Sequence, residues 1–310
     1  MLTRRQALIT TTAALALGIG LGPVNAQDKA PDRLKVVATF SILGDFVKNV
    51  GGDRVEVASL VGPNGDAHVY SPTPADAKTI ADAKIVFTNG LGFEGWMTRL
   101  VKASGTKAAM VVATKGVKPR QRGAAEPHDA DEKEGGTDPH AWQSVANAKI
   151  YVANIRDALV KADPAGKAAY EANAAAYLAT LDALEKEVKD ELARIPADRR
   201  KIITTHDAFG YFGLAYKIDF IAPQGVSTEA EVSAKDVGAI ITQIKKQKIP
   251  AVFLENVTDP RLLEQIAKES GAKIGGTLYS DALTDDKGPA PTYVDMMRHN
   301  IRTLSAALVS

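Results

Sequence analysis

The chain has 310 residues, with 38 lysines and arginines against 37 aspartates and glutamates, a formal net charge of +1 and no cysteine. This balance excludes the strongly basic surface that is typical of nucleic-acid-binding proteins. The absence of cysteine excludes disulfides and limits any metal site to nitrogen and oxygen donors, while the length suffices for two domains with their own cores.

The first 26 residues have the pattern of an export signal. Arg4 and Arg5 precede an apolar stretch at 7–21, and small residues lead up to Ala26. This pattern predicts cleavage after Ala26 and a periplasmic protein. The residues after the arginine pair support the twin-arginine route only weakly, so the export route stays open. Since no cysteine follows Ala26, we do not expect a lipid anchor.

Residues 27–162 contain four strand-like runs separated by helical runs, which predicts a parallel sheet with helices on its faces. His68 lies in a loop rich in Gly, Pro and Asn directly after the second predicted strand. His140, in TDPHAW, follows the fourth predicted strand and an acidic stretch at 119–138. Both histidines therefore lie beyond the carboxyl ends of strands, where open α/β sheets bind ligands.

A glycine motif in the same region resembles a nucleotide-binding turn. Gly90, Gly92 and Gly95 match G-x-G-x-x-G after a predicted strand. However, the motif follows the third strand instead of the first, and no ribose-binding acid ends the next strand. We interpret these glycines as a tight turn with Phe93 and Trp96 packed beneath it.

Residues 163–195 are predicted to form one long, rigid linking helix. Asp163 stands at the expected N-cap, Pro164 at the first helical position, and Pro196 ends the run. Apolar and small residues recur in alternating steps of four and three, which places them on one stripe. The stripe consists of Tyr170, Ala174, Tyr177, Leu181, Leu184, Val188, Leu192 and Ile195.

Residues 196–310 repeat the strand and helix order of the first part, which predicts an α/β protein of two similar lobes with a cleft between them. His206 ends the first strand of this second lobe, and Asp281 ends its fourth. His299 lies in a predicted terminal helix, where we expect a structural or solvated role.

Three imidazoles and one carboxylate therefore follow strand ends in two lobes. These are the usual donors for zinc, and four of them complete a tetrahedral shell. A closed shell holds a metal without leaving a position for water or substrate. The alternative is an exported zinc hydrolase, in which Asp281 acts as general base and one coordination position stays open.

Four segments resemble the exported zinc- and manganese-binding solute-binding proteins of ABC transporters, the ZnuA- and TroA-like group. The matching segments are HVYSPTPAD, TDPHAW, TTHDAFGYF and YSDAL, and the resemblance covers the whole mature chain. It implies a metal buried between two lobes joined by a rigid helix, a non-enzymatic carrier, and delivery to an inner-membrane permease. The family's ligand positions fall on His68, His140, His206 and Asp281. We expect a monomer that binds no nucleic acid.

The identity of the metal depends on the third ligand position. A histidine there resembles the zinc-binding members, whereas manganese-binding members more often have a carboxylate, so His206 favours Zn(II) as the cargo. Nitrogen-rich sites also prefer zinc to manganese. A manganese carrier of the same family remains the alternative within this class.

The acidic stretch departs from the family pattern. Zinc-binding members carry a histidine-rich loop here, whereas residues 119–138 contain one histidine, His128. High charge, glycine and few apolar residues are typical of a solvated loop. The functional alternative is a weak secondary zinc site made by His128, Asp129, Asp131 and Glu132, or a docking point for a periplasmic metallochaperone.

Deletion of residues 121–135 tests this alternative. If the loop delivers metal, the deletion should slow metal loading and leave the affinity of the tight site unchanged, because its donors lie elsewhere. Stopped-flow loading and equilibrium titration separate the two quantities. Unchanged loading would contradict a delivery role.

Overall fold

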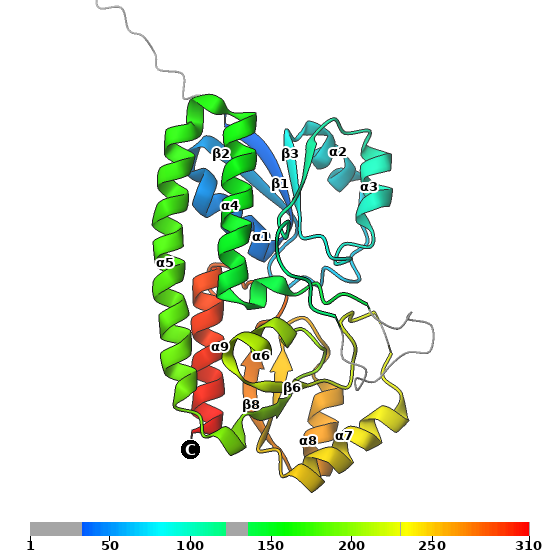
Figure 1. Cartoon of the computed structure of the whole chain (residues 1–310). Coiled ribbons are helices and arrows are strands. Elements are labelled where there is room, and N and C mark those ends of the chain that lie inside the picture. The colour runs from blue at the N-terminus through cyan, green and yellow to red at the C-terminus, as the bar shows by residue number, and fades with distance from the viewer. Residues whose placement is uncertain (1–32, 122–135, 230, 310) are drawn as a thin grey trace, which may run out of the picture. The chain divides into compact units, whose positions relative to one another are not determined.

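The computed structural model describes residues 33–121, 136–229 and 231–309, which belong to one compact unit (Figure 1). The predicted export segment at 1–26 lies outside the described residues, as do His128, Asp129 and Asp131. Within the described part of the chain, no helix is both long enough and apolar enough to cross a membrane.

Two four-stranded parallel sheets form the two lobes, as predicted. The first sheet has the order β2-β1-β3-β4, and its strands are β1 (Leu34–Phe40), β2 (Val55–Val61), β3 (Ile85–Thr88) and β4 (Ala109–Val112). The second has the order β6-β5-β7-β8, and its strands are β5 (Lys201–Ile203), β6 (Asp219–Ile221), β7 (Ala251–Glu255) and β8 (Lys273–Leu278). The identical order confirms that the lobes are similar.

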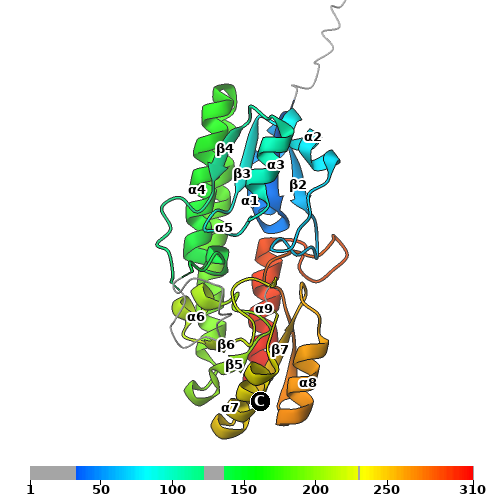
Figure 2. The ribbon, with the colours of Figure 1, turned by 90° about the vertical axis from the view of Figure 1, so that its right-hand side faces the viewer.

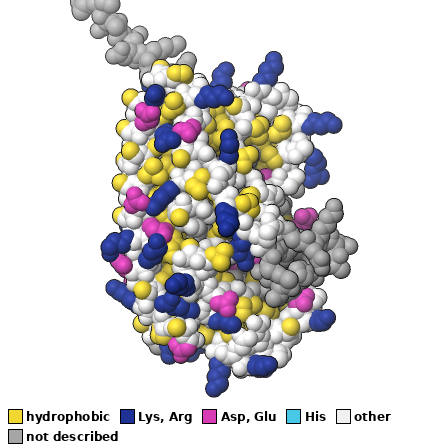
Figure 3. All heavy atoms as spheres, in the orientation of Figure 1, with side chains coloured by type: hydrophobic (Ala, Val, Ile, Leu, Met, Phe, Trp, Pro, Cys, Tyr) yellow, Lys and Arg dark blue, Asp and Glu magenta, His cyan; other side chains and the backbone are white. Residues whose placement is uncertain are grey.

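Helices flank both sheets (Figures 1 and 2). The first lobe contains α1 (Ser41–Gly51), α2 (Pro74–Asp82), α3 (Met97–Ser104) and α4 (Val145–Ala162). The second contains α6 (Gly210–Tyr216), α7 (Ala234–Gln247), α8 (Arg261–Ser270) and α9 (Tyr293–Leu308). On the face drawn in Figure 3, basic and acidic side chains are interspersed, in keeping with the near-neutral charge.

The linking helix α5 (Lys167–Ala193) runs alongside both lobes in Figure 1. Its 27 residues span roughly 40 Å at about 1.5 Å per residue. It packs against α1 and α4 of the first lobe and against α9 of the second. Every residue of the predicted stripe is buried. The structure therefore confirms one long helix that joins the lobes.

The start of α5 differs from the prediction. A short 3-10 helix, Pro164–Gly166, precedes it, and the Asp163 side chain makes no cap hydrogen bond. Instead, one carboxylate oxygen of Asp163 accepts hydrogen bonds from Arg54 Nη2 at 2.8 Å and from the Tyr170 hydroxyl at 2.8 Å. Because these partners bind the carboxylate, it is not available to cap the helix.

The main hydrophobic core continues from one lobe into the other. It contains Phe40 and Phe46 of the first lobe together with Phe212 and Met296 of the second, and the α5 stripe lies in the same cluster. A smaller core, around Val252, lies between α7, α8 and the second sheet. Apolar packing across the lobe junction opposes wide hinge motion, because separation would expose this surface.

A buried carboxylate lies at this junction. Asp45 on α1 accepts hydrogen bonds from the Tyr293 backbone N–H at 3.0 Å and the Tyr177 hydroxyl at 3.4 Å. Burial raises the pKa of Asp45 to about 6, against the opposing effect of these hydrogen bonds. The folded protein therefore binds this proton more tightly than the unfolded chain does. Asp45 makes its full contribution to the free energy of unfolding below pH 3.8, and this contribution is lost as the pH rises through about 6.

We predict that Asp45→Asn gains stability relative to the wild type as the pH rises from about 4 to about 7. The neutral amide avoids burial of a charge, which amounts to roughly 3 kcal/mol for a pKa shift of this size. Urea unfolding of both metal-free proteins across this range measures the difference. Asp182→Asn, at an exposed site, is the control, and an equal pH effect in both variants would contradict the prediction.

Candidate metal centre

Four side chains converge where the two sheets face each other. His68 lies in the loop between β2 and α2, and His140 directly precedes a 3-10 helix (Ala141–Gln143) that leads into α4. His206 follows β5 and Asp281 follows β8. These four side chains, called the four donors below, each offer one ligand atom, and the four atoms lie within 4.8 Å of one another. The structure thus brings together all four residues that the sequence selected.

Several distances between the four donors are close to those expected around a tetrahedral ion. His68 Nε2 lies 3.3 Å from His140 Nε2 and 3.2 Å from Asp281 Oδ2. Asp281 Oδ2 also lies 3.2 Å from His206 Nε2, and Asp281 Oδ1 lies 3.6 Å from His140 Nε2. A zinc–donor distance of about 2.0–2.1 Å implies a donor–donor distance of roughly 3.3 Å in a regular tetrahedron.

Burial of the four donors favours a bound cation. The side chains of His140, His206 and Asp281 are fully buried, and that of His68 is 4% exposed. Asp281 Oδ1 has no hydrogen-bond partner among the described residues. A buried carboxylate oxygen without a donor is costly, and a metal ion at this position would satisfy it.

Two further carboxylates orient the histidines from behind. Asp138 Oδ1 lies 2.8 Å from His140 Nδ1, and Glu255 Oε2 lies 2.7 Å from His206 Nδ1. A carboxylate at Nδ1 favours the proton there and leaves the lone pair of Nε2 directed at the metal. Glu255 is itself held, because its Oε1 accepts the backbone N–H groups of Thr205 and His206 at 2.8 and 2.9 Å.

The sequence analysis missed Asp138 and Glu255. Both could have been found by position: Asp138 stands two residues before His140, and Glu255 ends β7 at the same sheet edge as the donors. Strand-end acids are common, however, and only the tertiary structure selects which of them reaches an imidazole.

The loop that carries His68 is held by a contact to the second lobe. Asp66 Oδ1 accepts the His68 backbone N–H at 2.9 Å, and Asp66 Oδ2 accepts the Thr228 hydroxyl at 2.6 Å. The His68 ring also packs edge-on against Phe93, with 4.8 Å between ring centroids. His68 is thus positioned from both lobes.

The glycine motif forms a tight turn that already contains the carboxyl group of Glu94. The Glu94 carboxylate accepts hydrogen bonds from the backbone N–H groups of Asn89 at 2.6 Å and Gly90 at 3.1 Å. These are the groups that a phosphate would need. Phe93 and Trp96 are buried, as predicted. His299, for which the sequence analysis expects a structural or solvated role, contacts the Thr277 carbonyl on β8 through Nε2 at 3.0 Å.

Neighbouring charges determine the protonation of three of the four donors, His140, His206 and Asp281. Burial lowers the pKa of His140, but the charges of Asp281 and Asp138 outweigh it and raise the pKa to about 9. The pKa of His206 is likewise raised well above its usual range, because two carboxylates outweigh burial. Burial raises the pKa of Asp281, but His140 and His206 overcome this and hold it well below its usual range.

Metal affinity should therefore increase with pH. With a pKa of about 9, His140 holds a proton at neutral pH that a metal ion must displace. The apparent affinity should change by roughly tenfold per pH unit for each displaced proton. Zinc titration against a competing chelator between about pH 6 and about pH 8.5 measures the slope. An affinity that stays constant over this range would contradict coordination by imidazole.

Two α/β lobes, one long connecting helix and a buried cluster of three histidines and an aspartate are the features of a substrate-binding protein of a metal ABC transporter. Comparisons with known proteins identify the family. The family described as "Zinc-uptake complex component A periplasmic" matches residues 36–307. The chain belongs to this family.

Relatives match almost the whole chain. The manganese-binding lipoprotein MntA of Halalkalibacterium halodurans is 34% identical over 302 residues, which cover 97% of both chains. The iron-binding protein YfeA of Yersinia pestis is 34% identical over 304 residues, which cover 97% of this chain and 95% of that protein.

Solved structures share the fold. The periplasmic zinc-binding protein TroA from Treponema pallidum has a TM-score of 0.81 and 31% identity, with 90% of this chain and 100% of that chain covered. A manganese-bound periplasmic metal-binding protein from Candidatus Liberibacter asiaticus has a TM-score of 0.78 and 29% identity, with 89% and 100% covered.

Family membership decides between carrier and enzyme. The family consists of substrate-binding proteins of metal ABC transporters, which are not enzymes. The alternative of a zinc hydrolase with Asp281 as general base is therefore wrong. Members work with the permease and ATPase components of such transporters. Among the relatives, MntA is named a lipoprotein and TroA a periplasmic protein.

Proposed function

We propose that this protein captures Zn(II) in the periplasm and delivers it to the permease of an ABC transporter. The observation that carries the proposal is the set of four donors: three imidazole nitrogens and one carboxylate oxygen at tetrahedral spacing, in a buried site between the lobes. Since all four positions are occupied by protein atoms, the shell holds an ion without binding water or substrate.

The choice of zinc over manganese depends on His206. A third imidazole makes the site richer in nitrogen, and such sites bind zinc more tightly than manganese in the Irving–Williams order. The names of the relatives include manganese, iron and zinc, so these names by themselves favour no single metal. A manganese carrier of the same family is the second candidate.

We expect release to come from local movement of a loop, because the continuous core and α5 oppose wide opening. His68 is the least buried of the four donors and lies on a loop, so the loop between β2 and α2 is the proposed moving part. Local opening of this kind requires less free energy than separation of the lobes. We further propose that the carrier is a monomer, with cleavage after Ala26.

Alanine variants test the donor set. His140→Ala and His206→Ala each remove a buried nitrogen donor, so zinc affinity should fall by at least about 100-fold, while manganese should not replace zinc in either variant. His299→Ala is the matched control, because His299 contacts the Thr277 carbonyl on β8 and is none of the four donors. Chelator competition measures the affinities.

Elemental analysis after exposure of the wild type to equal concentrations of zinc and manganese identifies the cargo. The proposal expects one zinc per chain. Retention of manganese in preference to zinc would support the second candidate, and loss of zinc binding in His299→Ala to the same extent as in His140→Ala would contradict the assigned site.

A further inference from the structure

Arg120 lies between the two lobes, outside the four donors. Its guanidinium Nη1 lies 3.0 Å from Asp138 Oδ2 and 3.4 Å from Asp207 Oδ2. Asp138 precedes the donor His140 in the first lobe by two residues, and Asp207 directly follows the donor His206 in the second. One arginine therefore contacts a carboxylate beside a donor in each lobe.

Neighbouring residues hold the backbone of Arg120 by hydrogen bonds and leave space for its guanidinium. Its backbone N–H donates to the Tyr211 hydroxyl at 2.8 Å, and its carbonyl accepts the Asp138 N–H at 3.0 Å. A Cβ atom at Gly210 would lie 2.2 Å from Nη1, so only glycine leaves room for the guanidinium at the start of α6. The side chain is 19% exposed, which leaves the ion pairs partly shielded from water.

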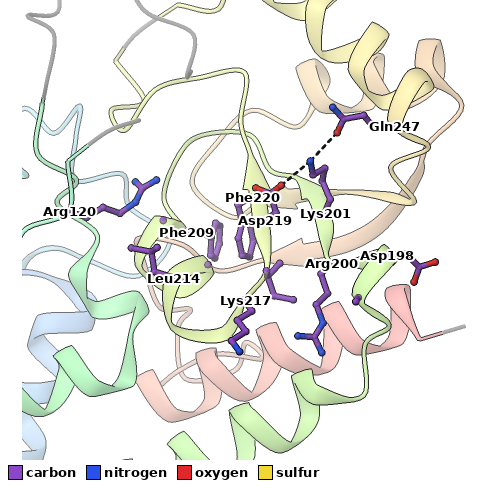
Figure 4. Close-up of a pocket in the computed structure, with 14 residues that line it drawn as sticks. Arg120, Asp198, Arg200, Lys201, Phe209, Leu214, Lys217, Asp219, Phe220 and Gln247 are labelled. Atoms are coloured by element: carbon purple, nitrogen blue, oxygen red, sulfur yellow. Dashed lines mark hydrogen bonds and ion pairs between the residues drawn. The ribbon is translucent and has the colours of Figure 1, made fainter. Parts of the chain in front are cut away.

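Arg120 also lines a surface pocket of the second lobe, shown in Figure 4. In that view it lies on the same side of the pocket as Phe209 and Leu214, whereas Lys201 pairs with Asp219 and Gln247 on the other side. The described residues that line the pocket include none of the four donors. Arg120 is thus the lining residue that connects this surface to the metal centre through Asp138.

The contacts form a series that runs from Arg120 through Asp138 to the donor His140. Asp138 uses both oxygens: Oδ2 contacts Arg120, while Oδ1 accepts the His140 backbone N–H at 2.9 Å and lies against the His140 ring nitrogen. Removal of the guanidinium would leave one oxygen of a fully buried carboxylate without this partner. The carboxylate would then be held through Oδ1 alone, which weakens its control over the orientation of the His140 ring.

We propose that Arg120 is a positioning residue of the metal centre, which fixes His140 through Asp138 and joins it to the His206 segment through Asp207. The inference rests on the proposed zinc-binding function of the four donors. Its physical basis is the planar guanidinium, which can bind two carboxylates at fixed angles, whereas a lysine ammonium cannot fix their relative orientation to the same degree.

The experiment compares Arg120→Gln with Arg54→Gln. Arg54 makes the same kind of hydrogen-bonded pair, but with Asp163 at the start of the linking helix, and neither residue is one of the four donors. Zinc affinity and the rate of zinc loss to excess chelator are measured for both variants. The visible spectrum of the cobalt(II)-substituted proteins reports the donor geometry directly.

We expect Arg120→Gln to weaken zinc binding by about 10- to 100-fold, mainly through faster dissociation, and to change the cobalt spectrum. Arg120→Lys should fall between this variant and the wild type. Arg54→Gln should lower the thermal stability of the metal-free protein and leave the affinity and the cobalt spectrum unchanged. Asp207→Asn, which keeps the Arg120–Asp138 pair, should weaken binding less than Arg120→Gln and serves as the test if Arg120→Gln does not fold.

The outcomes separate the two proposals. If the wild type itself does not bind zinc, the proposed function fails. If the wild type binds zinc, and folded Arg120→Gln binds it with the same affinity, dissociation rate and cobalt spectrum, then Arg120 is only a structural crosslink and this inference is overturned. For Asp207→Asn, wild-type affinity and dissociation rate would overturn it in the same way.

Discussion

The structure depends on the burial of Asp281 among three imidazoles. A carboxylate that is fully shielded from water is unfavourable unless positive charge lies beside it. In the metal-free protein, protonated histidines supply that charge, which is why the pKa of His140 is raised to about 9. A divalent cation can replace these protons, so one cluster is compatible with both the empty and the loaded state. Because protons and a metal ion can replace each other at Asp281, a fully buried site can still bind and release metal reversibly.

The fold supplies this cluster by bringing together the carboxyl ends of two parallel sheets. Each sheet has the same strand order, and segments that follow strand ends in both lobes supply the four donors. The helix α5 and the core that it shares with α1 and α9 hold the lobes at a fixed separation. The close spacing of the four donors, which come from four loops, is therefore maintained by packing that lies away from them.

Residues around the four donors fix their orientation, and one of these residues is itself held by Arg120. Asp138 and Glu255 orient two imidazoles, Asp66 holds the loop of the third, and Arg120 contacts Asp138 from the surface side. The three orienting carboxylates differ in exposure and partners, so the histidines are not equivalent. His140 and His206 are fixed from fully buried positions, whereas His68 depends on a loop contact to Thr228. This asymmetry favours His68 as the first donor to leave.

Periodicity and strand-end positions are local properties, so the amino-acid sequence alone predicts the repeat of strands and helices, the buried stripe of α5 and the four candidate donors. It also indicates that the glycine motif is not a nucleotide-binding site, because the motif follows the third predicted strand instead of the first. Other contacts become visible only in the folded protein. Glu94 fills the glycine turn, and Asp163 pairs with Arg54 instead of capping α5. Asp138 and Glu255 lie against the imidazoles of His140 and His206. These contacts join residues far apart in the chain or depend on side-chain direction, and no local pattern encodes either.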